Sequence, residues 1–296
     1  MSFSQQVKNE LCKNALPACC FRARLYGIVL FAGTLSPSKV RLKTESAALL
    51  SHAFSLIQTV CGVTPAAEGP GRGGYYRLSV TEPADVERLC SALGIAFAGP
   101  ARRIRYGLLE GECCRAAFLG GVFLSCGSVT DPARSYHLEF ETPHFSLSDD
   151  LCALLADFGL TPKLSVRKSC RVLYYKESEQ IEDLLTVLGA VGAAFALMDA
   201  KIVKDIRNNV NRLTNCETAN ISKTVEASGA QLASIRRVME RGLGTLPDSL
   251  RKVAELRLAN PDLSLSEIGK LLDPPLTKSG VSHRLKRIME IAEGDG

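Results

Sequence analysis

The stretch "CCFRARLYGIVLFAGTLS" (residues 19–36) returns in altered form as "CCRAAFLGGVFLSCGSVT" (residues 113–130). The correspondence continues, because "LLSHAFSLIQTVCGVTPA" (49–66) parallels "SLSDDLCALLADFGLTPK" (146–163), and "YYRLSVTEPADVERLCSALG" (75–94) parallels "CRVLYYKESEQIEDLLTVLG" (170–189). The offset between the copies stays between 94 and 97 residues, which is too long for a solenoid repeat. The repetition therefore predicts a duplicated domain with a pseudo-twofold axis.

The apolar pattern predicts the same order of elements in each copy: helix, hairpin, helix, hairpin, helix. In the first copy, residues 20–31 are apolar almost all round, which is typical of a buried helix. Residues 39–45 alternate between apolar and charged side chains and predict a half-buried strand. An amphipathic helix is expected to end at Gly62, and a short helix is expected over residues 83–94.

The composition indicates a chain that can bury sizeable cores, since 46% of its 296 residues are apolar. No apolar run is long enough to span a membrane. The first 18 residues are polar and do not resemble a signal peptide, so we expect a leader that precedes the folded part, no membrane partner and a cytoplasmic protein. The 11 cysteines are an odd number, which favours reduced thiols over a disulfide framework.

The net charge of +5 is concentrated in the last third of the chain. Residues 201–296 contain 16 Lys and Arg against 12 Asp and Glu, an excess of four, whereas residues 1–200 carry an excess of one. A basic terminal module is one characteristic of nucleic-acid binding, although solvated helical domains often carry a similar charge.

Two nonapeptides inside the repeats, "LYGIVLFAG" (25–33) and "LGGVFLSCG" (119–127), resemble degenerate copies of the LAGLIDADG motif. In that family the two motif helices pack side by side at the pseudo-twofold axis, glycine against glycine. Gly27 and Gly121 occupy the positions at which such close packing would need them. The resemblance also covers the order of the surrounding elements.

The same resemblance shows where this chain departs from the homing endonucleases. In those enzymes an acid just before the final glycine of each motif holds the catalytic metal. Here Ala32 and Cys126 stand at these positions, and Leu30 and Leu124 stand at the earlier acid position. Because Mg²⁺ needs hard oxygen ligands, we expect no catalytic residue, no metal site, no cofactor and no enzymatic activity.

The two predicted sheets differ in charge on the face with which nucleases of this fold grip DNA. The first copy offers Lys39, Arg41 and Lys43, and the second offers His137, Glu139 and Glu141. An acidic strand repels phosphate. Either both faces are only solvated, or the surface has been reshaped for a protein or a small ligand.

An apolar stripe after the second repeat predicts a linker helix over residues 201–220. The residues Ile202, Ile206, Val210 and Leu213 recur at helical spacing. Its polar side holds candidates for contacts with the DNA backbone: Lys204, Arg207, Asn208, Asn211 and Arg212. The helix either only docks on the core or also touches DNA.

The end of the chain predicts a helix-turn-helix. Helices are expected over residues 247–261, 264–272 and 278–293, and Ser264 with Glu267 has the spacing of a capping box. The last helix turns an apolar stripe inward, formed by Val281, Leu285 and Ile288.

The opposite face of that last helix is the predicted DNA-reading surface. Short polar residues near its N-terminus can approach base edges, while basic residues farther along can meet phosphates. The predicted DNA-binding residues are Lys278, Ser279, Ser282, His283, Arg284, Lys286 and Arg287. Arg284 lies beside the inner stripe and is equally consistent with an ion pair inside the module. The alternative is an ordinary helical bundle with a basic solvated face.

The segments "NNVNRLTNCETANISKTVEASGAQ" (208–231) and "SLSEIGKLLDPPLTKSGVSHRLKRI" (264–288) resemble the signature segments of the WhiA family. The resemblance implies a nucleoid-associated bacterial regulator that binds specific double-stranded DNA and acts in sporulation, cell division or chromosome segregation. Another regulator, RNA polymerase or an effector at the large domain are open candidates for further partners. Two alternative functions remain: a DNA endonuclease, and a ligand or protein sensor acting through the large domain.

The resulting α+β organisation has a duplicated, pseudo-twofold LAGLIDADG-like α/β domain followed by an all-α helix-turn-helix domain. Its predicted parts are a leader (1–18), the LAGLIDADG-like domain (19–200, with repeats 19–105 and 113–200), a linker helix (201–220) and the helix-turn-helix domain (221–296).

Three further patterns favour structural roles. The segment "EGPGRGGYY" (68–76) lacks the Gly-Lys-Ser/Thr ending of a phosphate loop and predicts a hairpin loop. Cys12 and the pairs Cys19-Cys20 and Cys113-Cys114 show no Cys-x-x-Cys spacing, and the two pairs begin the buried helices, so we interpret them as small packing residues. The histidines show no metal-ligand spacing; they are His52, His137, His144 and His283.

Overall fold

The chain forms two units, Met1–Asp205 and Ile206–Gly296, each with its own hydrophobic core. The computed structural model describes residues 1–71, 73–97, 101–240 and 246–294. None of the helices described is long and apolar enough to cross a membrane.

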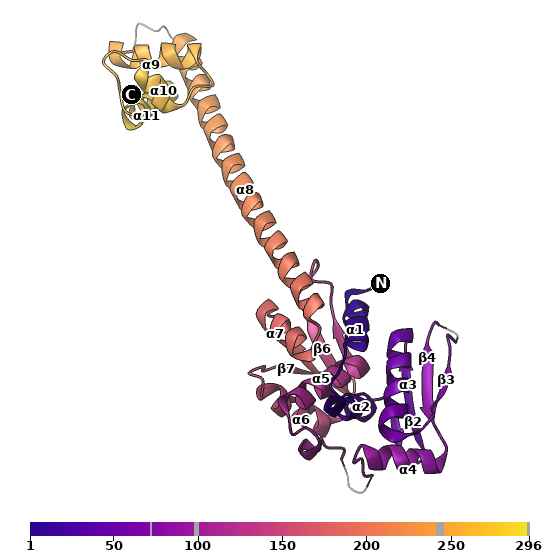
Figure 1. The fold of residues 1–296 in the computed structure, drawn as a ribbon. Helices are drawn as coiled ribbons and strands as arrows, with labels where there is room; N and C mark the ends of the chain where they lie inside the picture. The colour runs from indigo at the N-terminus through magenta and orange to yellow at the C-terminus, as the bar shows by residue number, and fades with distance from the viewer. Residues whose placement is uncertain (72, 98–100, 241–245, 295–296) are drawn as a thin grey trace. The chain divides into compact units, whose positions relative to one another are not determined.

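The first unit repeats one order of elements twice, as the sequence predicts (Figure 1). The first copy consists of α2 (Ala18–Leu30), β1 (Thr34–Ser36), β2 (Lys39–Thr44), α3 (Ala47–Cys61), β3 (Ala66–Glu68), β4 (Tyr76–Val80) and α4 (Pro83–Ala92). After a short 3₁₀ helix, η1 (Tyr106–Leu108), the second copy consists of α5 (Glu112–Cys126), β5 (Gly127–Val129), β6 (Leu138–Thr142), α6 (Phe145–Ala156), β7 (Lys163–Arg167), β8 (Cys170–Tyr175) and α7 (Ser178–Leu188).

Each copy contributes one antiparallel sheet with the same strand order, β1-β2-β4-β3 in the first and β5-β6-β8-β7 in the second. Val40 pairs with Val80 and Leu42 with Leu78. All four side chains are buried, which confirms the predicted half-buried strand. The helix before the second hairpin ends as expected, because Gly62 adopts the left-handed conformation (φ 62°) that favours glycine.

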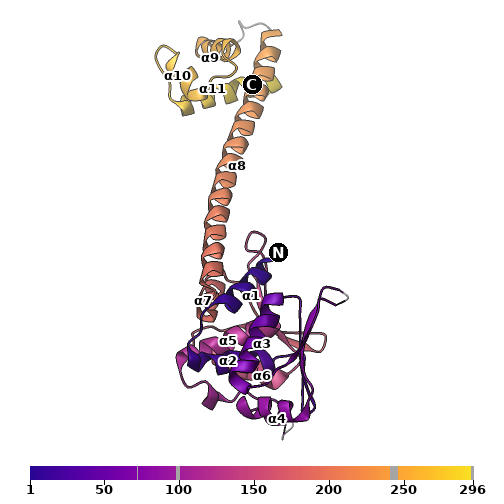
Figure 2. The same cartoon turned by 45° about the vertical axis from the view of Figure 1, so that its right-hand side comes forward.

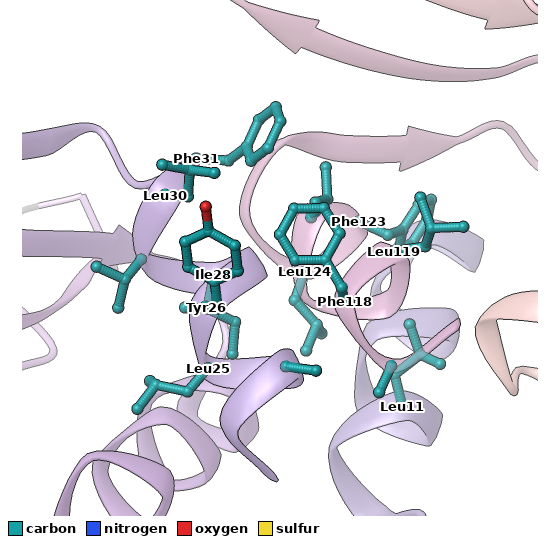
Figure 3. Packing of buried hydrophobic residues seen from close by; sticks show 14 of the residues in the cluster. Leu11, Leu25, Tyr26, Ile28, Leu30, Phe31, Phe118, Leu119, Phe123 and Leu124 are labelled. Carbon is teal, nitrogen blue, oxygen red and sulfur yellow. The ribbon is translucent and has the colours of Figure 1, made fainter. Parts of the chain in front are cut away.

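Helices α2 and α5 pack directly against each other at the pseudo-twofold axis, at the centre of the unit (Figure 2). A Cβ atom on Gly27 would lie 2.3 Å from the carbonyl oxygen of Phe118, and one on Gly121 would lie 2.2 Å from that of Arg24. The glycine-to-glycine approach expected from the motif is therefore confirmed. Large apolar side chains surround this crossing, and the rings of Tyr26 and Phe118 lie 5.2 Å apart (Figure 3).

The first 18 residues are part of the fold, so the expectation of a leader in front of it is wrong. Residues 3–13 form α1 (Phe3–Lys13), and Val7 and Leu11 are completely buried in the core of the first unit. The Glu10 carboxylate accepts hydrogen bonds from the backbone N–H groups of Gly192 (2.7 Å) and Ala193 (3.0 Å). The segment thereby supplies acceptors to a helix N-terminus about 180 residues downstream.

That downstream helix is far longer than the linker helix predicted over 201–220. It is α8 (Val191–Glu240), a continuous helix of 50 residues. The predicted apolar stripe does not dock on a core, because Ile202, Ile206, Val210 and Leu213 are each more than half exposed.

The second unit gathers three further helices at the C-terminal end of α8, namely α9 (Asp248–Ala259), α10 (Leu265–Lys270) and α11 (Lys278–Glu293) (Figure 1). Their core takes Ile235 and Val238 from α8 and the predicted stripe from α11. The stripe residues Val281, Leu285 and Ile288 are buried, so the predicted inward face of the last helix is confirmed.

Candidate nucleic-acid interface

The turn between α10 and α11 is fixed by local chemistry that the sequence predicts. Ser264 and Glu267 form the expected capping box: the Glu267 N–H donates to Ser264 Oγ (3.3 Å), and the Ser264 N–H donates to Glu267 Oε2 (2.8 Å). Hydrogen bonds from the Ser264 side chain and from the Ser264 backbone N–H to the Glu267 carboxylate lower the pKa of Glu267. After α10 the chain turns back so closely that a Cβ on Gly269 would lie 2.2 Å from the Leu276 carbonyl oxygen.

The other helices are tied to this turn by side chains that bond to backbone carbonyls. Arg257 of α9 is buried and donates from Nη1 to the Leu263 carbonyl oxygen, 2.5 Å away. Ser228 of α8 donates to the Pro261 carbonyl oxygen (3.0 Å). The N-cap residue of α9 is Pro247, and no side chain caps this helix. The module therefore holds α10 and α11 in a defined geometry.

The N-terminus of α11 is capped by Thr277, whose Oγ1 accepts the Gly280 N–H (3.2 Å). The first turns of the helix expose short polar and basic side chains, as predicted. The exposed members of the predicted DNA-reading surface are Lys278, Ser279, Ser282, His283, Lys286 and Arg287. On the other side of the helix, Val281 and Leu285 are buried in the core. The helix therefore cannot rotate this polar face away from solvent without exposing these two side chains.

Arg284 differs from the rest of the predicted set. It is half-buried, and its Nη1 donates to the Ser249 carbonyl oxygen of α9 (3.2 Å). The alternative expected from the sequence, an ion pair with an acid, is wrong, because this partner is a backbone carbonyl. Arg287 is exposed and forms an ion pair with Glu290 (2.9 Å), so DNA would have to compete with this partner.

The polar positions predicted on the linker helix lie on α8. Arg207, Asn208, Asn211 and Arg212 are exposed. Lys204 is half-buried and places its Nζ 4.4 Å from the centroid of the Tyr136 ring. Lys204 therefore has a cation–π partner inside the first unit, which makes it the weakest of these candidates.

The two sheet faces differ less in charge than the sequence predicts. In the first sheet Arg77 is the cross-strand neighbour of Lys43, and its charge is offset by an ion pair with Glu68 (3.0 Å). In the second sheet Glu139 Oε2 lies 2.9 Å from His137 Nε2 and 3.4 Å from Arg167 Nη2. A cation from β7 thus offsets part of the acidic strand, and sequence reasoning missed it because β7 lies far along the chain.

Ala32 follows the C-terminal end of α2, and Cys126 is the last residue of α5, where it interacts with Lys8 of α1. Burial raises the pKa of Cys126 to about 12 and lowers the pKa of Lys8. A pocket of about 280 Å³ nearby is lined by Lys8, Lys43 and Glu45, among others. A neutral thiol and two lysines at this place disfavour a divalent cation.

The cysteine pairs lie at the opposite end of the same helices. Cys19 and Cys113 are exposed, so their interpretation as packing residues is wrong, whereas Cys20 is buried as expected. The sulfur atoms of both pairs converge to within 4.8 Å of one another. The signal that could have revealed this is their equal position in the two repeats, combined with the parallel packing of the motif helices.

Comparison with known proteins connects this geometry to one family. A family model described as "WhiA C-terminal HTH domain" matches residues 210–292, and a "WhiA LAGLIDADG-like domain" matches residues 115–207. Similar curated proteins include a "Probable cell division protein WhiA" from Alkaliphilus metalliredigens, 38% identical over 310 residues (99% of this chain, 98% of the relative). One of the same name from Clostridium novyi is 39% identical over 315 residues (99% and 98%).

Solved structures show the same fold. The crystal structure of full-length DUF199/WhiA from Thermatoga maritima aligns with this chain at 26% sequence identity and a TM-score of 0.60. The alignment covers 100% of this chain and 99% of the chain in that structure. A crystal structure of the N-terminal LAGLIDADG domain of DUF199/WhiA aligns with this chain at 21% sequence identity and a TM-score of 0.51. The alignment covers 64% of this chain and 92% of the chain in that structure.

Proposed function

This chain belongs to the WhiA family, and we propose that it is a sequence-specific, non-enzymatic DNA-binding regulator. Its helix-turn-helix reads double-stranded DNA, and its LAGLIDADG-like domain is a scaffold without nuclease activity. It acts in the cytoplasm, at the nucleoid. The curated relatives are named as probable cell division proteins, which favours cell division as the process regulated here.

The observation that carries this proposal is the solvent face of α11. The helix is held by a buried stripe on one side, and on the other it exposes Ser279, Ser282 and His283 in its first turns and Lys286 one turn later. Short side chains let the helix backbone approach the floor of the major groove, while the cation can meet a phosphate. This division into base readout and backbone contact is what sequence specificity requires.

The chemistry at the axis supports the absence of nuclease activity. Two-metal or one-metal phosphodiester cleavage needs oxygen ligands that hold the cation beside the scissile phosphate. Ala32 and Cys126 supply none, and Lys8 adds positive charge beside Cys126.

The experiment compares variants of the full chain by fluorescence anisotropy. The duplexes are a fragment recovered from genome-wide occupancy of the intact protein and a scrambled version of it, each measured at several salt concentrations. Lys286→Ala should weaken binding to both duplexes about equally and reduce the slope of log K against log salt by about 0.9, because roughly one fewer counterion is released. Ser282→Ala and His283→Ala should instead narrow the difference between the two duplexes, by about 1–3 kcal/mol for each lost base contact.

Lys252→Ala is the matched control, since Lys252 is an exposed lysine on α9 outside the proposed surface. It should leave the specificity ratio and the salt slope unchanged. If alanine at Ser279, Ser282, His283 and Lys286 together left specific binding intact, α11 would not be the reading helix. Site-specific nicking of plasmid DNA by the purified chain with Mg²⁺ or Mn²⁺ would overturn the non-enzymatic part of the proposal.

A further inference from the structure

Four cysteine thiols meet at the N-terminal end of the helix pair. Cys19 and Cys20 lie in the first turn of α2, and Cys113 and Cys114 lie in the first turn of α5. All four sulfur atoms are within 4.8 Å of one another, and this is the one such convergence of potential metal ligands among the residues that the structure describes. Each repeat supplies two thiols, so the cluster bridges the pseudo-twofold axis.

The spacing of the sulfur atoms is close to that of a tetrahedral thiolate site. Sulfurs bound to zinc at about 2.3 Å stand about 3.8 Å from one another. The Sγ atom of Cys19 lies 3.8 Å from that of Cys20 and 4.0 Å from that of Cys113. A disulfide would need two sulfurs to approach to about 2.05 Å, which is a larger movement than closure around a metal ion.

Two features of the surroundings would stabilise negative charge on these sulfurs once a metal ion is bound. Both pairs stand at helix N-termini, where the partial positive charge of the helix stabilises a thiolate. The buried guanidinium of Arg24 interacts with Cys12 and, within the cluster, with Cys20, and its Nε and Nη1 atoms have no hydrogen-bond partner among the described residues. A buried cation without a partner is costly. An anionic cluster beside Arg24 would offset its charge.

The protonation of the cluster is uneven. Hydrogen bonds from Cys20 and Cys19 lower the pKa of Cys113, whereas burial raises the pKa of Cys20 and of Cys114. Cys19 and Cys113 are exposed and give an ion a path to the two sulfurs that are less exposed.

We propose that Cys19, Cys20, Cys113 and Cys114 bind one soft, thiophilic divalent cation of the Zn²⁺ class. Binding joins one Zn²⁺ to four sulfurs and releases one proton for each thiol that was protonated. The ion fastens the start of α2 to the start of α5 and so ties the two repeats together. This replaces the expectation of a chain without a metal site, and it is independent of DNA reading by α11.

The test uses Co²⁺ as the probe on the full-length chain, reduced and stripped of metal with a chelator. Tetrahedral thiolate coordination gives a charge-transfer band in the near ultraviolet and strong ligand-field bands in the red. We expect these bands to saturate at one equivalent of Co²⁺ and to disappear when one equivalent of Zn²⁺ is added. Zn²⁺ should also raise the Tm of the first unit.

The Cys19→Ser/Cys113→Ser variant should lose both the spectrum and the rise in Tm. Cys216→Ser is the matched control, because Cys216 is an exposed cysteine on α8 outside the cluster, and it should retain both. Should the double variant fail to fold, the single variant Cys113→Ser takes its place, since Cys113 is exposed.

Three results would overturn the proposal. The first is the absence of the tetrahedral spectrum in the reduced chain. The second is a spectrum retained by the cluster variant, which would place the ion elsewhere. The third is a Cys19–Cys113 disulfide, found by mass spectrometry, in a chain that takes up no Co²⁺ after reduction.

Discussion

The helix crossing at the pseudo-twofold axis allows a prediction with a built-in control. In Gly27→Ala the added Cβ would lie 2.3 Å from the Phe118 carbonyl oxygen and 2.9 Å from the Val122 nitrogen. Both are backbone atoms of α5, which cannot move away as a flexible side chain can. Since ordinary van der Waals contacts are 3.4–4 Å, α2 and α5 must move apart by roughly 1 Å.

The magnitude follows from two opposing contributions. Overpacking a core costs about 1–3 kcal/mol, occasionally more, and a backbone contact this short belongs at the upper end of that range. Replacing a helical glycine by alanine returns about 0.5–1 kcal/mol. The net loss is about 2 kcal/mol, which corresponds to a fall in Tm of about 4–8 °C for a unit of this size.

Differential scanning calorimetry of the full chain measures this effect. Gly33→Ala is the control, because a Cβ there would meet nothing within 4 Å, and its Tm should stay within about 2 °C of the wild type. Gly27→Ala combined with Gly121→Ala should lose less than the sum of the single variants, since one separation of the helices accommodates both methyl groups. A Tm for Gly27→Ala equal to that of Gly33→Ala would refute the close crossing.

Three further predictions concern other parts of the chain. Glu10→Ala should lower the Tm of the first unit by about 2–4 °C, because about 1 kcal/mol of capping at the start of α8 is lost; Glu10→Gln should lose less, and equal losses would contradict the capping role. Arg284→Met should lower the stability of the second unit by about 1 kcal/mol through the lost bond to the Ser249 carbonyl and leave the salt slope of DNA binding unchanged; a reduced slope would instead indicate a phosphate contact. Burial, with a smaller contribution from Arg24, lowers the pKa of His52 to about 4. The unfolded chain therefore binds this proton from about pH 6.5 downward, and stability should fall as the pH drops from there to about 4. His52→Gln should flatten that part of a plot of Tm against pH, and an unchanged slope would argue against this assignment.

The features that the sequence could predict are those fixed by local chemistry or by repetition. The duplication is visible in the sequence because the two copies pack in the same way. Both motif helices need a glycine where they cross, so Gly27 and Gly121 occur at matching positions. The capping box of Ser264 and Glu267 depends only on residues three apart. The alternation in β2 depends only on which face of the strand is buried.

The features that could not be predicted depend on contacts between distant segments. The polar N-terminal sequence does not by itself indicate a packed helix. The helix α1 is stabilised by the burial of Val7 and Leu11 in the core of the first unit. Arg284 could reach an acid or a backbone carbonyl, and the choice depends on where α9 lies. The apolar stripe on α8 was wrongly predicted to dock on a core for another reason. Apolar residues at helical spacing usually indicate burial, yet Ile206 and Val210 are exposed in this chain.

Under the proposed function, the two ends of the helix pair would have different requirements in a scaffold that has no nuclease activity. At the crossing, Gly27 and Gly121 contact backbone atoms, so any larger side chain displaces a whole helix. At the C-terminal ends, acids would only hold a metal, and bringing two carboxylates together without that metal costs free energy through like-charge repulsion. With Ala32 and Cys126 at these ends, the chain avoids this cost. A DNA-binding regulator of the proposed kind would therefore need the two glycines for its scaffold, and would not need acids at the C-terminal ends of these helices.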